Sequence, residues 1–225
     1  MDTFKKSAGR TFLALLLLAL ASGGAGAGEF AAGLHAGYNA GVGFQGSGTF
    51  LNFTRDVPLS ARFTLGYHWT SAGDPYAARR IFINNNTNGS PEKSANLWMM
   101  RFDLLFPVFD LGSQKMYFFG GARHGRYTAN FNYVGGNENF DVKSNPWGLG
   151  LGFETWFAIG ETTDFVAQLG VDYFGKSALQ GHDTTYMPSG DDVNPREDYT
   201  YEDADAAIDQ PGWEMLVMIG IRVRL

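Results

Sequence analysis

The chain has 225 residues, of which 30 are glycine, 15% are aromatic and none is cysteine, and its formal net charge at pH 7 is −6. A chain without cysteine forms no disulfide bonds, no thiolate metal sites and no lipid-modified cysteine. Its acidic balance argues against nucleic acid as a partner, and its mean hydropathy of −0.17, without a long apolar run beyond the N-terminal region, argues against a helical membrane protein.

The N-terminal segment predicts a cleavable signal peptide. Three basic residues precede the apolar stretch "TFLALLLLAL" (11–20), which is too short for a stable membrane anchor and is followed by small residues. We predict a signal peptide over residues 1–27, cleaved after Ala21 or Ala27, and one domain over residues 28–225. Removing residues 1–27 takes away three basic residues and one acidic residue, so the formal net charge moves from −6 to −8.

Five later segments alternate apolar residues with small or polar ones, at the period of two that is typical of β-strands. In "FAAGLHAGYNAG" (30–41), Leu34 and Tyr38 fall on one face, and Gly33 and His35 fall on the other. The other four segments are "LSARFTLGYHWT" (59–70), "PWGLGLGFETWFAIG" (146–160), "DFVAQLGVDYF" (164–174) and "GWEMLVMIGIRVRL" (212–225). Each predicts a strand with one apolar face and one mixed, partly charged face.

Three further strands are less regular. "GTFLNFTR" (48–55) puts Leu51 and Phe53 outward and leaves Phe50 inside, whereas "NLWMMRFDLLF" (96–106) alternates cleanly. "KMYFFGGARHGRYTANFNYVG" (115–135) does not keep one phase, because its second half favours Tyr127, Ala129, Phe131 and Tyr133 on the outer face. We therefore predict a bulge near residues 120–125.

The connections between these eight strands alternate in length. The long ones are 42–47, 73–94, 135–145 and 179–211, and the short ones are 56–58, 109–114 and 160–163. This pattern predicts an all-β fold, an eight-stranded antiparallel up-and-down transmembrane β-barrel with short periplasmic turns and longer external loops. The last strand is expected to pair with the first, because each unpaired backbone group in lipid costs several kcal/mol.

Aromatic residues beside the longer loops predict a girdle at the membrane interface. These are Tyr38, Tyr67, Trp69, Trp98, Tyr127, Trp147, Tyr173 and Trp213.

Polar residues on the inward positions predict a network inside the barrel. They are His35, Arg62, His68, Arg101, Asp103, Glu154, Gln168, Asp172, Glu214, Arg222 and Arg224. Eight strands leave an interior just wide enough for side chains to fill, so we expect these groups to pair and close the lumen. The alternative is a narrow gated conduit along the same residues.

This pattern resembles that of the small eight-stranded outer-membrane barrels, the class of the OmpA barrel, OmpX and OmpW, over residues 30–225. The resemblance implies an integral protein of the cell outer membrane with surface-exposed loops and a structural or surface-interaction role. It also implies a monomer without a cofactor, whose partners are outer-membrane lipids, lipopolysaccharide and the barrel-assembly machinery. One departure is the final residue, Leu225, where such proteins usually end on an aromatic residue.

Two other functions stay open on the sequence. One is a narrow channel for small or apolar solutes, similar to OmpW. The other is a lipid A modifying enzyme, because "GYHWTSAG" (66–73) places His68 near Ser71, and a nucleophilic serine needs a neighbouring base. The two residues fall in opposite phases of the strand, so we expect them to diverge and predict no enzyme.

The longest loops are charged. Residues 179–211 carry nine acidic residues against Arg196, and the candidates for binding Ca²⁺ or bridging to lipopolysaccharide phosphates are Asp191, Asp192, Asp203, Asp205 and Asp209. The loop lacks the glycine and terminal glutamate of an EF-hand, so we predict no metal site and a solvated, mobile segment. Arg79, Arg80 and Lys93 in the 73–94 loop are expected near lipid A phosphates.

Overall fold

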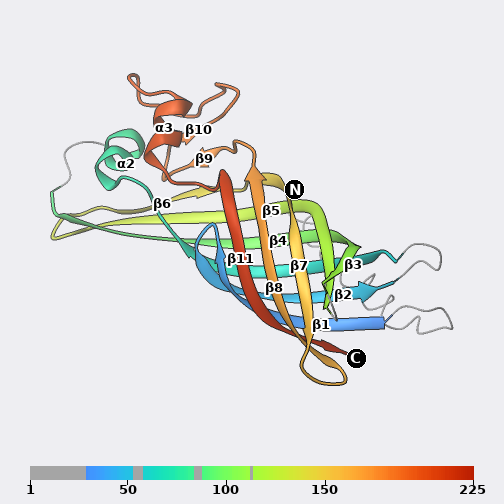
Figure 1. Ribbon diagram of the computed structural model, residues 1–225. Helices are drawn as coiled ribbons and strands as arrows, with labels where there is room; N and C mark the ends of the chain where they lie inside the picture. Colours follow the sequence, from blue (N-terminus) through green and yellow to red (C-terminus); the bar gives the residue numbers. More distant parts are fainter. Residues whose placement is uncertain (1–28, 53–57, 84–87, 112–113) are drawn as a thin grey trace, which may run out of the picture.

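Eight antiparallel strands close into a ring in the computed structural model, which describes residues 29–225 apart from 53–57, 84–87 and 112–113 (Figure 1). The strands of the ring are β1 (Glu29–Asn39), β2 (Val42–Leu51), β3 (Ser60–Thr70), β4 (Ser90–Leu111), β5 (Gln114–Val134), β7 (Trp147–Ala158), β8 (Thr163–Phe174) and β11 (Trp213–Arg224). The predicted fold class, an eight-stranded up-and-down barrel, is confirmed. The predicted signal peptide over residues 1–27 lies outside the described residues.

The ring is closed by the first and last strands. β1 pairs with β11 from Ala31 opposite Arg224 to Asn39 opposite Leu216, and the backbone N–H of Leu225 donates to the carbonyl of Phe30 at 2.8 Å. A sheet closed in this way leaves no strand edge without a hydrogen-bonding partner, which is the condition for strands to cross a bilayer.

The outer face of the ring is apolar. On β11, for example, the side chains of Trp213, Met215, Val217, Ile219 and Ile221 are all exposed. Residues of this kind normally form a core, so a continuous exposed band of them indicates contact with lipid. Eight residue steps along this strand cover about 27 Å, and with the strand tilt this suits the thin apolar band of an outer-membrane barrel.

The first hairpin corrects one expected loop. Residues 42–47 belong to β2, because Ala40 and Gly41 reverse the chain with φ angles of 57° and 151°. Because β2 begins at Val42, earlier than expected, its alternation leaves Phe50 exposed and Leu51 buried. The predicted orientation of these two residues was wrong, and Phe53 lies outside the described residues.

β5 also corrects the prediction. It keeps a single phase without the expected bulge near 120–125, and Arg123, Tyr127, Ala129, Phe131 and Tyr133 are all buried on its inner face. The register irregularity lies on β4 instead, between Pro107 and Phe109. The large aromatic residues fit on the inner face because protein, not lipid, covers that part of the strand.

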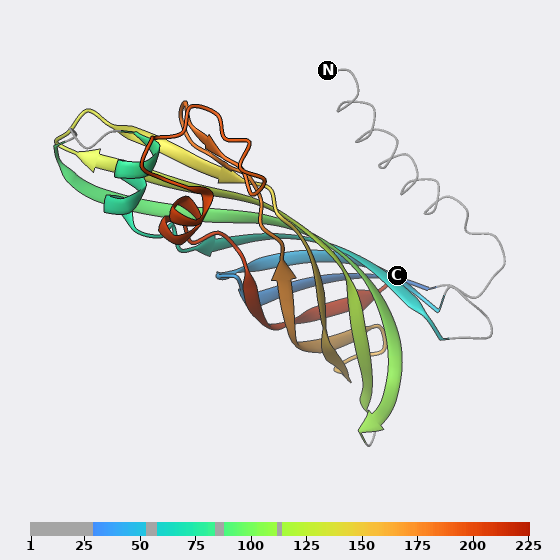
Figure 2. The same ribbon diagram turned by 90° about the horizontal axis from the view of Figure 1, so that it is seen from above.

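That cover belongs to a folded layer beyond the barrel, seen at the upper left of Figures 1 and 2. β4 and β5 run past the other strands, β6 (Asn139–Ser144) pairs with β5, and β9 (Leu179–Gln180) and β10 (Thr185–Tyr186) follow. Two short helices, α2 (Pro75–Phe82) and α3 (Tyr201–Ala207), pack with them. We call the described parts of residues 71–97, 125–146 and 175–212 the platform.

The platform has its own apolar core, formed mainly by Ile81, Phe82, Phe131, Phe140, Leu179, Tyr186 and Ala204. The three longest predicted loops therefore carry ordered secondary structure, which differs from the solvated segment expected over 179–211. No helix in the part of the chain that the structure describes is long and apolar enough to cross a membrane.

Candidate functional site: the lumen network and the platform

The centre of the lumen is organised around Arg123. Its Nη1 donates to Asp103 Oδ1 and its Nε donates to Asp172 Oδ1, both at 2.7 Å. These residues stand on β5, β4 and β8, and all three side chains are 0% exposed. Asp103 also accepts contacts at 3.3 Å from Arg62 and Arg101. Three guanidinium groups thus surround one carboxylate.

Further polar side chains extend this cluster around the barrel wall. Arg62 is paired with Glu154, whose Oε1 accepts a hydrogen bond from Trp156 Nε1 at 2.6 Å. Arg101 Nη1 donates to Gln45 Oε1 at 3.0 Å, and the Gln45 amide nitrogen lies 3.2 Å from the His68 ring. The network therefore joins strands on opposite sides of the ring.

One aromatic ring contacts two of the arginines. The guanidinium carbons of Arg62 and Arg101 lie 5.3 and 5.5 Å from the centre of the Phe119 ring, which is fully buried. Such cation–π contacts stabilise charges that have lost their water. Phe119 therefore fills space in the lumen and also stabilises the charges of Arg62 and Arg101.

A second ion pair fills the lumen near the chain ends. Arg222 Nε donates to Asp164 Oδ2 at 3.2 Å, and its guanidinium carbon lies 3.3 Å from the centre of the Trp156 ring. Trp156 in turn stacks on Tyr117 with ring centres 3.6 Å apart. Asp164, Arg222, Trp156 and Tyr117 thus form one continuous series of contacts.

The buried charges balance. Among the described residues, four arginines and four acids are buried inside the barrel: Arg62, Arg101, Arg123 and Arg222 with Asp103, Glu154, Asp164 and Asp172. Burying an ion without a partner costs several kcal/mol, whereas paired and hydrogen-bonded ions are tolerated. The buried inward positions of the strands therefore carry equal numbers of positive and negative side chains, as a filled lumen requires.

Glycine makes room for this network at one decisive place. A Cβ added to Gly150 on β7 would overlap the Asp172 carboxylate and lie 2.5 Å from Arg123 Nη2. The Arg123–Asp172 pair therefore lies flat against the backbone of β7. A side chain at position 150 would displace the pair.

The structure places the predicted lumen residues as follows. His35, Arg62, His68, Arg101, Asp103, Glu154, Gln168, Asp172 and Arg222 are buried inside the barrel. Glu214 is half-buried near the platform end, where it accepts from the backbone N–H of Gly212. Arg224 is partly exposed at the other end and donates to the carbonyl of Glu161 at 2.7 Å.

Four members of the network are absent from the predicted set. With Tyr127 outward, an unbroken phase would also put Arg123 outward, so a bulge is expected near 120–125 and Arg123 is assigned to neither face. Asp164 stands at the start of a predicted strand and is likewise not assigned to the inner face. Asn39 donates to Asp172 Oδ2 at 3.1 Å, and Gln45 lies in a stretch expected to be a loop. A correct start for β2 and a single phase for β5 would have identified Gln45 and Arg123.

Seven of the eight predicted girdle residues lie on the outer face: Tyr38, Tyr67, Trp69, Trp98, Trp147, Tyr173 and Trp213. Tyr127 is a correction, because its ring is 0% exposed and its hydroxyl donates to the carbonyl of Ser71 at 2.8 Å. Burial of this ring in the platform core raises the pKa of the Tyr127 hydroxyl above its usual range.

The platform core continues down to the rim of the barrel. Ala40, Ala72, Met99 and Phe174 belong to the same apolar cluster as Ala207 and Ile208, at the end of α3. Asn39 joins the two regions, since its amide nitrogen lies 3.4 Å from Met99 Sδ and 3.1 Å from Asp172. The ion network is thus covered at this end by apolar side chains.

Both faces of β4 change character at the same height. The outer face passes from Phe102, Met100 and Trp98 to Asn96 and Ser94, while the inner face passes from Asp103 and Arg101 to Met99, Leu97 and Ala95. This pattern is expected of a strand that has lipid outside a polar lumen below Trp98, and water outside an apolar core above it. Trp98 is therefore the proposed membrane boundary.

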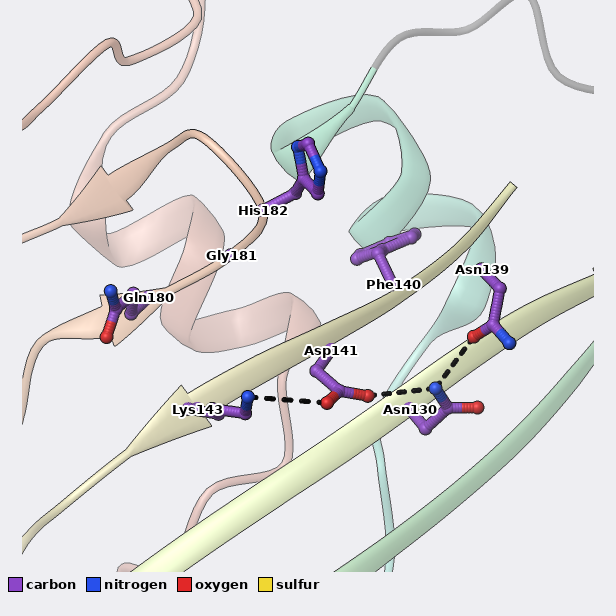
Figure 3. A pocket seen from close by; sticks show the side chains of 8 residues that line it. All are labelled: Asn130, Asn139, Phe140, Asp141, Lys143, Gln180, Gly181 and His182. Carbon is purple, nitrogen blue, oxygen red and sulfur yellow. Dashed lines mark hydrogen bonds and ion pairs between the residues drawn. The ribbon is translucent and has the colours of Figure 1, made fainter. Parts of the chain in front are cut away.

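A groove of about 580 Å³ lies on the water-facing side of the platform, between β6 and the segment after β9 (Figure 3). Asn130 Nδ2 donates to Asn139 Oδ1 at 2.8 Å and to Asp141 Oδ1 at 2.9 Å. Lys143 Nζ lies 3.4 Å from Asp141 Oδ2. Gln180, Gly181 and His182 complete the lining on the other side.

The residues considered for enzyme chemistry do not meet. His68 is buried in the lumen beside Gln45, whereas Ser71 lies at the base of the platform, where its hydroxyl oxygen is 3.4 Å from the backbone N–H of Gly73. The expected divergence of the two side chains agrees with these positions.

The acidic candidates for a metal are likewise separate. Asp191 accepts from Ser189, Asp192 from the backbone N–H of Met187, and Asp205 from Gln210. Asp203 forms the capping box of α3 with the N-cap residue Thr200, and hydrogen bonds from Thr200 lower the pKa of its carboxyl group. Asp209 is exposed. Within the described ranges, no group of three or more His, Asp or Glu side chains could hold a metal ion.

Two of the three basic residues of the 73–94 loop, Arg79 and Lys93, contact the platform itself. The guanidinium of Arg79 lies over the rings of Tyr76 and Tyr133. Lys93 Nζ donates to the carbonyl of Gly73 at 2.5 Å, and Arg80 is exposed on α2.

Comparison with known proteins gives a match at the level of structure. No protein-family model matches the sequence, and no curated protein matches it. A major outer membrane protein from Thermus thermophilus superposes with a TM-score of 0.72 at 21% identity, covering 88% of this chain and 100% of that one. Neisserial surface protein A (NspA) superposes with a TM-score of 0.42 at 15% identity, covering 88% of this chain and 95% of that one. CarO2 of Acinetobacter baumannii superposes with a TM-score of 0.46 at 11% identity, covering 88% of this chain and 99% of that one.

The shared fold agrees with the features described above. The chain has the fold of the small eight-stranded outer-membrane β-barrels, and its apolar exterior is that of an integral protein of the outer membrane.

Proposed function

Because this chain has the fold of a small eight-stranded outer-membrane barrel, we propose that it is a non-conducting scaffold that holds a folded platform at the cell surface. Its role is structural and surface-interacting, and it is not an enzyme. The observation that carries this proposal is the pair of contacts from Arg123 to Asp103 and Asp172, which spans the bore at the centre of the lumen.

Paired charges favour a plug over a conduit. An ion or solute crossing the lumen has to separate Arg123, Arg62 and Arg222 from their carboxylates. Breaking one buried pair costs roughly 3 to 5 kcal/mol because a bare charge is left behind. The apolar cluster around Met99 adds a second obstacle on the platform side.

The orientation follows from the length of the connections. β1 begins and β11 ends on the side of the ring that lies opposite the platform, as Figure 1 shows. In outer-membrane barrels short turns face the periplasm and long connections face outward. These features support a platform that lies outside the cell, where its polar surface meets other molecules.

Planar-bilayer recording tests the proposal. Purified protein is expected to insert without conductance steps. A second sample carries Arg123→Ala together with Asp172→Ala, which empties part of the lumen without leaving a lone charge, and small steps are expected from it. Regular steps from the unaltered protein would overturn the scaffold and support the narrow channel instead.

The enzyme alternative has a separate test. Mass spectrometry of lipid A from cells with and without the protein is expected to show the same acyl content. A change in acyl content that requires His68 would overturn the non-enzymatic role.

A further inference from the structure

The water-facing side of the platform sheet continues the lipid-facing side of the barrel. We call it the outer polar face, and its central residues are Ser94, Asn96, Asn130, Asn139, Asp141 and Lys143. Ser94 lies opposite Asn130, and Asn130 lies opposite Asp141, so one row of polar residues crosses β4, β5 and β6. The row lies four residues beyond Trp98 on the same face of β4.

This position has a physical consequence. With the exposed apolar band of β4 ending at Trp98, lipid chains that cover this band would place the headgroups of the same lipids beside Ser94 and Asn96. The outer polar face is therefore continuous with an interface that lipid already occupies, and its partner is a headgroup that rises several ångströms above the apolar layer.

The chemistry of the face suits sugar hydroxyl groups. Asn130 is held by Asn139 and Asp141 at 2.8 and 2.9 Å (Figure 3). These bonds fix the side chains and use neither Asn130 Oδ1 nor Asn139 Nδ2. Asp141 and Lys143 lie 3.4 Å apart and stay 39% and 49% exposed. Amides, a carboxylate and an ammonium together offer both donors and acceptors, as hydroxyl groups require.

The charge of the cluster argues against a purely anionic ligand. Lys143 is already paired with Asp141, so the cluster carries no net charge. The groove of about 580 Å³ beside it is in the size range of small-ligand sites. A neutral or weakly charged saccharide fits these conditions better than a bare phosphate does.

We propose that the outer polar face binds the saccharide part of a glycolipid in the outer leaflet, with its sugars in the groove between Asn139, Lys143 and Gln180. Arg126, which lies opposite Trp98 and is exposed, stands at the level of the lipid phosphates. This inference rests on the proposed function, because it requires the platform to be folded outside the membrane.

Single cysteines test the proposal in the full chain, which has no cysteine of its own. Ser94→Cys places a thiol on the outer polar face, Ser189→Cys places one on an exposed turn elsewhere on the platform, and Ser144→Cys places one on the buried face of β6. Each variant is reconstituted in vesicles of phosphatidylethanolamine and phosphatidylglycerol, with or without lipopolysaccharide. The rate of reaction with a water-soluble maleimide is then measured.

Lipopolysaccharide is expected to slow the reaction of Ser94→Cys about tenfold, the effect of one good hydrogen bond to a charged group. Ser189→Cys should react at one rate in both kinds of vesicle. Adding Asn139→Ala and Lys143→Gln to Ser94→Cys should restore its rate, whereas adding Lys176→Gln, which removes an exposed lysine elsewhere, should leave the protection intact.

Equal rates for Ser94→Cys in both kinds of vesicle would overturn the proposal, and so would equal slowing of Ser189→Cys by lipopolysaccharide. Equal protection of Ser94→Cys by water-soluble deacylated lipopolysaccharide would also overturn it, because the ligand would then be a free saccharide and not a membrane glycolipid. Fast reaction of Ser144→Cys is a different outcome. It would show an unfolded platform, and would count against the proposed function from which this inference starts.

Discussion

Arg123 lies between Asp103 and Asp172 and is 2.7 Å from an oxygen of each, with all three side chains fully buried. One arginine on β5 therefore connects β4 to β8 through the middle of the barrel. The pairing neutralises Asp172 and, together with Arg62 and Arg101, also Asp103, in a lumen with little room for water.

Arg123→Ala should strongly destabilise the barrel, because it removes the arginine paired with Asp172 and one of the three arginines around Asp103. The expected loss is about 3 to 5 kcal/mol, measured by urea unfolding of the protein in lipid vesicles. Arg126→Ala, which removes an exposed arginine three residues along the same strand, should change the free energy of unfolding little. Equal effects of the two substitutions would contradict the central role of Arg123.

Gly150→Ala should also destabilise the barrel. The added Cβ would overlap the Asp172 carboxylate, and forcing a methyl group into a packed interior costs about 1 to 3 kcal/mol. Gly46→Ala is the matched control on β2, where a Cβ would meet only Leu34 Cδ2 at 3.9 Å. The midpoint of unfolding in urea should fall for the first variant and stay unchanged for the second.

The membrane boundary at Trp98 predicts opposite responses to charge on one face of β4. Phe102→Lys puts an ammonium group into the apolar band and should cost about 2 to 4 kcal/mol. Ser94→Lys puts the same group into water and should cost close to nothing. The folded fraction is read from the different migration of unheated and heated samples on an SDS gel. Equal tolerance of both substitutions would contradict the boundary.

The platform should lose stability at high pH. Burial raises the pKa of Tyr127, so above about pH 10 the unfolded chain releases a proton that the folded platform keeps. Stability is then fully present below that pH and falls as the pH rises further. Proteolysis of the platform should therefore accelerate in this range, and Tyr127→Phe should weaken the dependence. If Tyr127→Phe leaves the pH profile unchanged, the loss of stability at high pH comes from other groups.

The barrel could be predicted from the sequence because its strands alternate strictly. His35, Arg62, Arg101 and Asp103 needed only their phase relative to apolar neighbours to be assigned to the lumen. Periodicity cannot tell what covers an apolar face, and this explains the error at Tyr127, where the platform core takes the place of lipid. With Tyr127 assigned outward and a bulge expected at 120–125, the sequence pattern leaves Arg123 without an assigned face.

The platform itself was not predictable in the same way. Its core joins Phe82, Phe131, Tyr186 and Ala204, which lie in four separate segments of the chain and have no shared period. Short elements such as β9 and α3 depend on these long-range contacts more than on local propensity. Acidic residues at the ends of such elements made the segment look like a solvated loop.

The closure of β1 against β11 is the central structural claim, and a disulfide tests it most directly. Ala36 lies opposite Ile219 on these strands, and neighbouring strands bring Cα atoms about 4.5 to 5.5 Å apart, within the range of a disulfide. Ala36→Cys with Ile219→Cys should cross-link under mild oxidation in lipid vesicles, whereas Ala36→Cys with Met215→Cys, four residues away, should not. No cross-link in the first pair, or equal cross-linking in both, would contradict a closed barrel.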